Sequence, residues 1–181
     1  MQRPTVFALL TLLLAAVPRP GLAEGPEPAA AERAEIQPMP ELRVEALDGR
    51  ILDSQELRGQ VVLLDIWATW CGPCLWAAPQ LDSIYADFND RGVEMIGIAV
   101  DSGSAAEVAK AAKAYGMTYP VTLWSEELAE SIHNLRALPT YILITPDWTV
   151  HRTWVGPVSP KVLRRQIEGL LGVDAEGEAK R

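Results

Sequence analysis

The segment Val61–Trp67 is apolar at every position except Asp65. A strand that exposes one face to water alternates apolar and polar residues, whereas a strand covered on both faces is apolar throughout. This segment therefore predicts the central strand of a sheet that carries helices on both sides. The chain's two cysteines, Cys71 and Cys74, follow shortly after it and are separated by two residues. Any chemistry of these thiols is thus expected where the central strand meets the next helix.

Other periodic segments alternate between strand and helix along the chain. Strands are predicted at 42–46, 51–52, 93–100, 120–123, 141–145 and 149–155, and helices at 75–88, 105–115, 126–135 and 160–171. Asp48-Gly49 favours a tight hairpin turn between the first two strands, and Pro146-Asp147 suits a type I turn between the last two. This order predicts an α/β sandwich around a mixed, mostly parallel sheet, with an N-terminal β-hairpin.

Composition narrows the function classes. The chain has 181 residues, with 16 Lys and Arg against 24 Asp and Glu, and a formal net charge of −8. Binding to a nucleic-acid backbone needs a basic surface, so the charge disfavours this class of partner. Two cysteines form at most one disulfide, which excludes a small disulfide-stapled scaffold and a zinc module held by four thiolates. The length suits one domain.

The first 23 residues have the layout of a secretory signal peptide. Arg3 precedes a short apolar run at 6–17, and the small residues Gly21 and Ala23 stand near the predicted cleavage site. The run is short for a membrane span, although an uncleaved membrane anchor is the alternative. Export would place the cysteines in an oxidising compartment.

The remaining chain divides into three parts. Residues 24–40 are rich in Pro, Ala and Glu and are expected to form a disordered linker. Residues 41–172 are expected to form the domain, and residues 173–181 a disordered tail. Residues 1–23 carry two Arg and no acid, so their removal leaves 14 basic and 24 acidic residues and a net charge of −10.

The cysteine spacing favours redox chemistry. A helix N-terminus stabilises a thiolate, so Cys71 would attack a substrate disulfide and Cys74 would resolve the mixed disulfide. A structural disulfide is the alternative, although so short a loop constrains little of the unfolded chain. A zinc site would need further ligands, and His133 and His151 lie 18 residues apart. Haem attachment would need His at position 75, which is Leu.

Several separated motifs occur in order along the chain. They are LDGRILDSQELRGQVVLLDIWATWCGPC, then Pro79, then IGIAVD at 96–101 and ALPTYILI at 137–144. In these motifs the chain resembles the TlpA/ResA/CcmG group of exported thioredoxin-fold thiol:disulfide oxidoreductases. The resemblance extends from about residue 41 to residue 171 and implies a thioredoxin-like three-layer α/β/α sandwich.

The resemblance also implies roles for individual residues. Pro139 matches the proline that follows a cis peptide bond beside the active-site disulfide, whereas an ordinary trans proline is the alternative from sequence alone. Its neighbours Leu138 and Thr140 would offer backbone hydrogen bonds to an extended substrate. Asp65, six residues before Cys71, matches a buried carboxylate that exchanges a proton with the resolving cysteine. Burial would raise its pKa and suit it as a general base; an acid held by structural hydrogen bonds is the alternative.

The residues around the cysteines have more local roles. Gly72 and Pro73 keep the loop tight, and Pro73 is acceptable in a first helical turn. Trp70 would shield the disulfide and contact partners. Trp76, on the first turn after the cysteines, would form part of an apolar docking rim, or would pack against the sheet. Members of the group often carry Glu three residues after the second cysteine, where this chain has Ala77, so the narrow partner choice linked to that Glu is not expected.

These features predict an exported enzyme that reduces disulfides of periplasmic proteins, because Gly72-Pro73 is also the pair found in reducing thioredoxins. A disulfide-forming oxidase or an isomerase is the nearest alternative, although an isomerase usually needs dimerisation, which nothing in the sequence indicates. A Cu(I) metallochaperone that binds copper through Cys71 and Cys74 is another, from a different class. Roles in cytochrome c maturation and in metal-site assembly both stay open.

The expected partners follow from the same residues. The chain has no obvious phosphate, flavin or nicotinamide motif, so no small-molecule cofactor or metal is expected. Electrons are expected from a membrane thiol donor and are passed to protein disulfides. A monomer is expected, either periplasmic or secreted, or anchored in the inner membrane and facing the periplasm.

Overall fold

The computed structural model describes residues 37–100, 102–132 and 135–172. The predicted export segment, most of the predicted linker and the predicted tail lie outside the described residues. Within the described residues, no helix is both long enough and apolar enough to cross a membrane.

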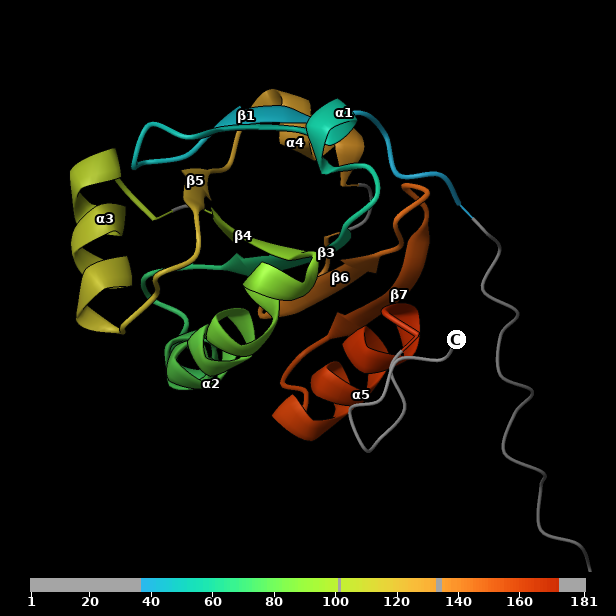
Figure 1. The fold of residues 1–181 in the computed structure, drawn as a ribbon. Coiled ribbons are helices and arrows are strands. Elements are labelled where there is room, and N and C mark those ends of the chain that lie inside the picture. The colour runs from blue at the N-terminus through green and yellow to red at the C-terminus, as the bar shows by residue number, and fades with distance from the viewer. Residues whose placement is uncertain (1–36, 101, 133–134, 173–181) are drawn as a thin grey trace, which may run out of the picture. The chain divides into compact units, whose positions relative to one another are not determined.

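The central sheet has the strand order β5-β4-β3-β6-β7 (Figure 1). The strands are β3 (Val61–Trp67), β4 (Val93–Ala99), β5 (Val121–Leu123), β6 (Thr140–Ile144) and β7 (Val150–Val155). β4 is parallel to β3 and to β5, whereas β6 is antiparallel to β3 and to β7. Only β6 therefore runs against the other strands of this sheet. The predicted mixed, mostly parallel sheet is confirmed, and β3 is its central strand.

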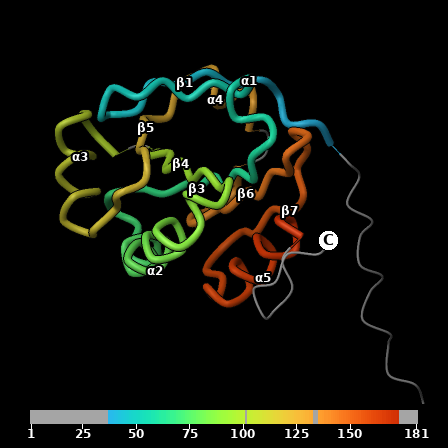
Figure 2. Tube along the Cα trace, viewed as in Figure 1, coloured from blue at the N-terminus to red at the C-terminus, as the bar shows by residue number. Residues whose placement is uncertain are grey.

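Helices cover both faces of the sheet, as the tube view in Figure 2 also shows. They are α1 (Ser54–Leu57), α2 (Gly72–Phe88), α3 (Ala105–Ala114), α4 (Glu126–Ser131) and α5 (Pro160–Leu170), with a 3-10 turn η1 (Asn89–Arg91) after α2. Helices α2 and α5 lie on one face, and α1 and α4 lie on the other with the hairpin (Figure 1). The core forms two apolar clusters, one on each face.

Residues of β3 alternate between these two clusters. Val61, Leu63 and Trp67 belong to the cluster that includes α2, α3 and α5. Val62, Leu64 and Ile66 belong to the other cluster, with the hairpin and α4. Asp65 is in phase with the first set, so its side chain is on the α2 face of the sheet. All seven residues of β3 are buried, as the apolar sequence predicts.

The N-terminal hairpin pairs β1 (Arg43–Glu45) with β2 (Ile51–Asp53) in antiparallel register. Gly49 in its turn has a φ of 86°, a left-handed conformation that costs glycine little. The Asp48 carboxylate accepts hydrogen bonds from the backbone N–H and the guanidinium of Arg50. The hairpin predicted from Asp48-Gly49 is therefore confirmed.

The turn before β7 attaches the start of the described chain to the domain. It is closed by a hydrogen bond of 2.9 Å from the Trp148 N–H to the Thr145 carbonyl. Trp148 has a φ of 66°, which is uncommon for a bulky residue. Its buried indole donates a 3.1 Å hydrogen bond to the Pro40 carbonyl, and Met39 is buried in the same cluster. Residues 37–40 thus pack on the domain, so the prediction that the disordered linker extends to residue 40 is wrong for these four residues.

Two helices differ from their predicted extent by three or more residues, and one short helix was not predicted. α2 begins at Gly72, three residues before its predicted start, because Cys71 acts as its N-cap. α4 ends at Ser131, four residues before its predicted end. α1 was not predicted; it is a single turn that begins where the Asp53 side chain accepts a hydrogen bond from the Gln55 N–H.

Candidate redox site

Cys71 and Cys74 form a disulfide at the N-terminus of α2, with 5.3 Å between their Cα atoms. Cys71 is the N-cap of the helix, and the Cys74 N–H points to its Sγ at 3.3 Å. Pro73 lies in the first helical turn, where its missing N–H leaves no intrahelical hydrogen bond unmade. When the disulfide is open, the N–H groups and the dipole of this helix end favour a thiolate at Cys71.

The disulfide lies beside a groove of about 570 Å³. Cys71 lines this groove, whereas Cys74 is only 2% exposed and does not line it. Trp70 borders the groove and is 66% exposed. The other lining residues are Gly72, Pro73, Val100, Leu135, Arg136, Ala137 and Leu138. An incoming sulfur atom therefore reaches Cys71 before Cys74.

The segment before β6 forms the opposite wall of the groove. Its Leu138–Pro139 peptide bond is cis, as the resemblance implies. Leu138 lines the groove, whereas Pro139 and Thr140 are buried behind it. The Pro139 carbonyl accepts a 2.8 Å hydrogen bond from the Gly156 N–H, and the Thr140 hydroxyl donates to the Ala137 carbonyl at 2.7 Å. Of these three predicted residues, the structure brings the Leu138 side chain to the same groove as Cys71.

A hydrogen-bond link fixes the loop that leads into the cysteines. The Thr69 N–H donates to the Ser102 hydroxyl at 3.0 Å, and that hydroxyl donates to the Val100 carbonyl at 2.8 Å. The Val100 N–H in turn donates to the Trp67 carbonyl. The ends of β3 and β4 are thereby tied together beside the disulfide. Ser102 carries no local sequence signal for this role, because it acts on a residue 33 positions away.

Asp65 is buried on the α2 face of β3 and is 2% exposed. One of its oxygens, Oδ2, accepts a 2.9 Å hydrogen bond from the Tyr119 hydroxyl. The other, Oδ1, is buried and has no hydrogen-bond partner among the described residues. Burial raises the pKa of this carboxyl to about 7, and the Tyr119 hydrogen bond acts in the opposite direction. The prediction of a raised pKa thus agrees with its environment, but Tyr119 was not anticipated.

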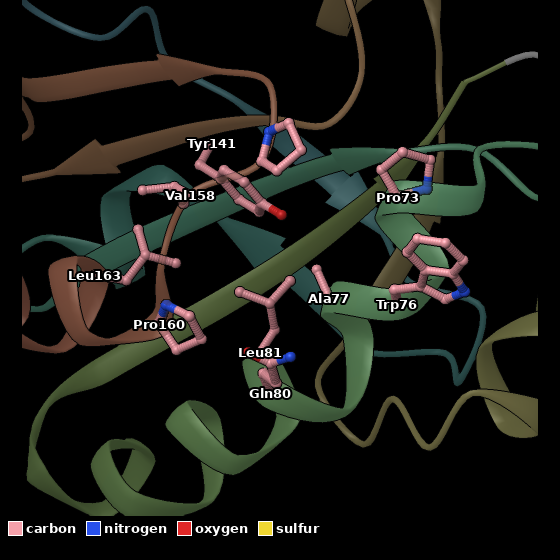
Figure 3. A pocket seen from close by; sticks show the side chains of 10 residues that line it. Pro73, Trp76, Ala77, Gln80, Leu81, Tyr141, Val158, Pro160 and Leu163 are labelled. Atoms are coloured by element: carbon pink, nitrogen blue, oxygen red, sulfur yellow. The ribbon is translucent and has the colours of Figure 1, made fainter.

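A second, smaller cavity of about 280 Å³ lies between α2 and the start of α5 (Figure 3). Pro73 and Trp76 form its rim on the α2 side, and Ala77 lies deeper (Figure 3). The Tyr141 hydroxyl points into the cavity (Figure 3). The Ala77 side chain makes this wall of the cavity apolar. Pro73 borders both cavities, so the two adjoin at the helix N-terminus.

The tryptophans divide into core and surface residues. Trp67 is fully buried, as expected. Trp76 is 79% exposed, so its alternative role, packing against the sheet, is wrong.

Among the described residues, no group of three or more His, Cys, Asp and Glu side chains is arranged to hold a metal ion.

Comparison with known proteins agrees with this geometry. Residues 34–171 match the Redoxin family. Thiol-disulfide oxidoreductase ResA of Bacillus thuringiensis (strain Al Hakam) is 30% identical over 132 residues, which is 73% of this chain and 73% of that protein. ResA of Bacillus subtilis (strain 168) is 29% identical over 68% of this chain and 69% of its own length.

A solved structure shows the same fold. It is a thiol:disulfide interchange protein, a thioredoxin family protein from Chlorobium tepidum TLS, with a TM-score of 0.71 and 28% identity over 77% of this chain and 99% of that chain. The match to the family covers most of the sequence and includes the cysteine pair, the cis-proline segment and the central strand. The chain belongs to the Redoxin family and, within it, to the TlpA/ResA/CcmG-like group of thioredoxin-fold thiol-disulfide oxidoreductases.

Proposed function

We propose that this protein is an exported oxidoreductase that reduces disulfide bonds of other proteins through Cys71 and Cys74. The observation that carries this proposal is the position of the cysteine pair. Its first sulfur caps α2 and lines an open groove, while its second sulfur lies behind the first and away from the groove. A structural crosslink needs neither a groove beside it nor a helix N-terminus that favours one thiolate.

The reaction would proceed in two exchanges. The Cys71 thiolate attacks one sulfur of the substrate disulfide, and the other substrate sulfur leaves as a thiolate. The Cys74 thiol then loses its proton and attacks the Cys71 Sγ, which releases the second substrate thiolate. Two electrons pass to the substrate, and the Cys71–Cys74 disulfide forms. No cofactor is needed for either step, and a membrane thiol donor would reduce the pair again.

Substrate binding would use the groove and its rim. An extended segment that carries the substrate disulfide would lie between Trp70 and the cis-proline segment, and it would form strand-like hydrogen bonds with the backbone there. The walls of the groove are mostly apolar, and Arg136 is an exposed cation on its edge. We infer that the site accepts protein disulfides, and that the predicted periplasmic location supplies them.

Replacing each cysteine by serine should block a different step of the reaction. We expect Cys71→Ser to abolish the acceleration of insulin reduction by dithiothreitol and to form no adduct with the substrate. Cys74→Ser should instead retain the first attack and accumulate a mixed disulfide at Cys71, detectable by mass spectrometry under non-reducing conditions. An unchanged insulin rate in Cys71→Ser would contradict the proposed function.

The reduction potential of the Cys71–Cys74 pair distinguishes a disulfide reductase from a disulfide-forming oxidase. Redox equilibration with glutathione, followed by alkylation, should give a value near those of reducing thioredoxins, about −270 mV. A value near −120 mV, about that of a strong periplasmic oxidant, would favour the disulfide-forming oxidase instead. Stoichiometric, tightly held copper in the reduced protein would favour the metallochaperone.

A further inference from the structure

Asp65 is the one charged residue among the buried polar residues of the described chain. The titratable groups that share its face of the sheet are Cys71, Cys74 and Tyr85 from α2, Tyr119 before β5, and Tyr141 from β6. Burial and the Tyr119 hydroxyl act on the Asp65 carboxyl, and no described cation compensates its negative charge. The guanidinium of Arg50 interacts with Tyr85 instead. The Tyr119 hydroxyl is its hydrogen-bond donor. The negative charge of Asp82, on the exposed side of α2, also raises the pKa of the Tyr119 hydroxyl.

Tyr119 is held in place from three sides. Asp82 of α2 accepts hydrogen bonds from the N–H and the hydroxyl of Thr118 at 2.6 and 2.7 Å, which attaches the preceding residue to the helix that carries the cysteines. The ring of Tyr85 packs against the Tyr119 ring edge to face, with 6.0 Å between centroids. The Gly97 N–H donates to the Pro120 carbonyl at 2.8 Å, which fixes the following residue to β4.

Gly97 provides the space for this tyrosine. It lies beside Asp65 in the parallel register of β3 and β4. A Cβ atom at position 97 would come within 3.1 Å of the Tyr119 ring and 3.3 Å of the Trp67 indole nitrogen. Both distances are shorter than ordinary van der Waals contact. The strand next to Asp65 thus leaves space for a tyrosine ring to reach the carboxylate.

We propose that Tyr119 is a positioning residue for Asp65: its hydroxyl holds Oδ2, so that the unpartnered Oδ1 is the atom that takes the proton from Cys74. This role rests on the proposed function. In the mixed disulfide, the Cys74 thiol transfers its proton to Oδ1 and becomes the thiolate that attacks the Cys71 Sγ. The Cys71 Sγ–substrate bond breaks, and the substrate leaves as a thiolate. Oδ1 later returns the proton to solvent.

The hydrogen bond also affects the pH at which this transfer works. A phenol that donates to a carboxylate stabilises the ionised form, which opposes the effect of burial. Without the phenol, Asp65 would hold its proton to a higher pH and could not accept another from Cys74. The resolving step would then need a more alkaline medium, while the first attack by Cys71 would not.

The test uses the reduced full-length protein and the small disulfide dithiobis(nitrobenzoate), which releases one coloured thiolate on attack and a second on resolution. For Tyr119→Phe we expect the pH midpoint of the second phase to rise by about one unit, and its rate at pH 7 to fall about fivefold. The first phase should keep its pH profile. Tyr115→Phe is the control, because it removes a tyrosine hydroxyl at the exposed end of α3 and leaves the packing around Asp65 and Tyr119 intact, so its midpoint should equal that of the wild type.

A second pair of variants separates positioning from packing. If Tyr119 acts through Asp65, adding Tyr119→Phe to Asp65→Asn should cause no further change in the resolution rate or its pH profile. Uniform slowing of both phases with an unchanged midpoint would overturn the proposal, as would additive slowing in the double variant. The carboxyl carbon of Asp65, followed by NMR in the reduced protein, gives its pKa without any substrate. The pKa of Asp65 should be higher in Tyr119→Phe than in the wild type, and an equal pKa would overturn the role of Tyr119. This comparison holds even if the protein proves not to reduce protein disulfides.

Discussion

Asp65 combines two properties that oppose each other. Its burial in the central strand disfavours the charged form, and a single hydroxyl opposes that effect. A group in this balance titrates near neutrality, where a proton acceptor for a thiol is most useful. The same balance has a cost in stability, because a carboxylate inside the core is less well solvated than one in the unfolded chain.

The stability of the oxidised protein should therefore depend on pH through Asp65. Its carboxyl has a pKa of about 7 in the folded protein against 3.8 as the reference value, so between these pH values the folded state binds more protons than the unfolded state. The free energy of unfolding should then fall as the pH rises through this window. Asp65→Asn should remove that fall and be more stable than the wild type at pH 8, by an amount on the order of a few kcal/mol.

Urea unfolding at pH 5 and pH 8 measures both effects. Glu94, a half-buried acid on the adjacent strand, provides a control, because Glu94→Gln should keep the pH dependence of the wild type. An Asp65→Asn protein whose stability still falls between the two pH values by the wild-type amount would show that the carboxyl is not the cause.

At the scale of elements, α2 joins the chemistry to the surface. Its N-terminus holds the disulfide, its inner face packs in the core, and its first exposed turn presents Trp76. The sequence predicted this helix but placed its start at residue 75, because helical periodicity begins only after the cysteines. The cap at Cys71 became visible only in three dimensions. α1 and the early end of α4 were missed for a similar reason, since single turns carry little periodicity.

Trp76 should contribute to the binding of protein substrates but not to the exchange chemistry. It borders the cavity that adjoins the disulfide and exposes a large aromatic surface, a residue type enriched at binding interfaces. For Trp76→Ala we expect the KM for insulin reduction to rise by about fivefold or more. The rate with dithiobis(nitrobenzoate) should stay unchanged, because a small disulfide does not reach this rim.

Tyr115 supplies the matched control. It is another exposed aromatic residue, at the end of α3, and it lines none of the cavities near the disulfide. Tyr115→Ala should leave both assays unchanged. Equal losses with the large and the small substrate in Trp76→Ala would mean that the tryptophan supports the redox site itself instead of substrate docking.

At the scale of the whole molecule, residues 37–40 act as a part of the domain. Met39 fills a place in the core between the hairpin and the sheet, and the Trp148 indole fixes the carbonyl of the next residue. These contacts lie on the face of the sheet opposite α2. They are therefore expected to support the stability of the domain without taking part in the exchange reaction.

Met39→Ala should destabilise the protein without altering the chemistry. Removal of a buried Met side chain costs about 2–5 kcal/mol, and this loss should appear as a lower urea midpoint. The insulin rate at 25 °C should stay near that of the wild type. Val162→Ala, at an exposed position on α5, is the control and should change the midpoint little. A wild-type urea midpoint for Met39→Ala would show that this segment does not belong to the core.

The sequence by itself determined the central strand, the hairpin, the order of the strands and of the helices longer than one turn, and the cysteine pair at a helix start. These features depend on local patterns: apolar runs, turn residues and spacing within a few positions. Only the tertiary structure decided which side chains meet at the site. The partner of Asp65 is 54 positions away, and the serine that fixes the loop before the cysteines is 33 positions from its contact. Such pairs depend on strand register and helix placement, which bring distant residues together without leaving a pattern in either segment.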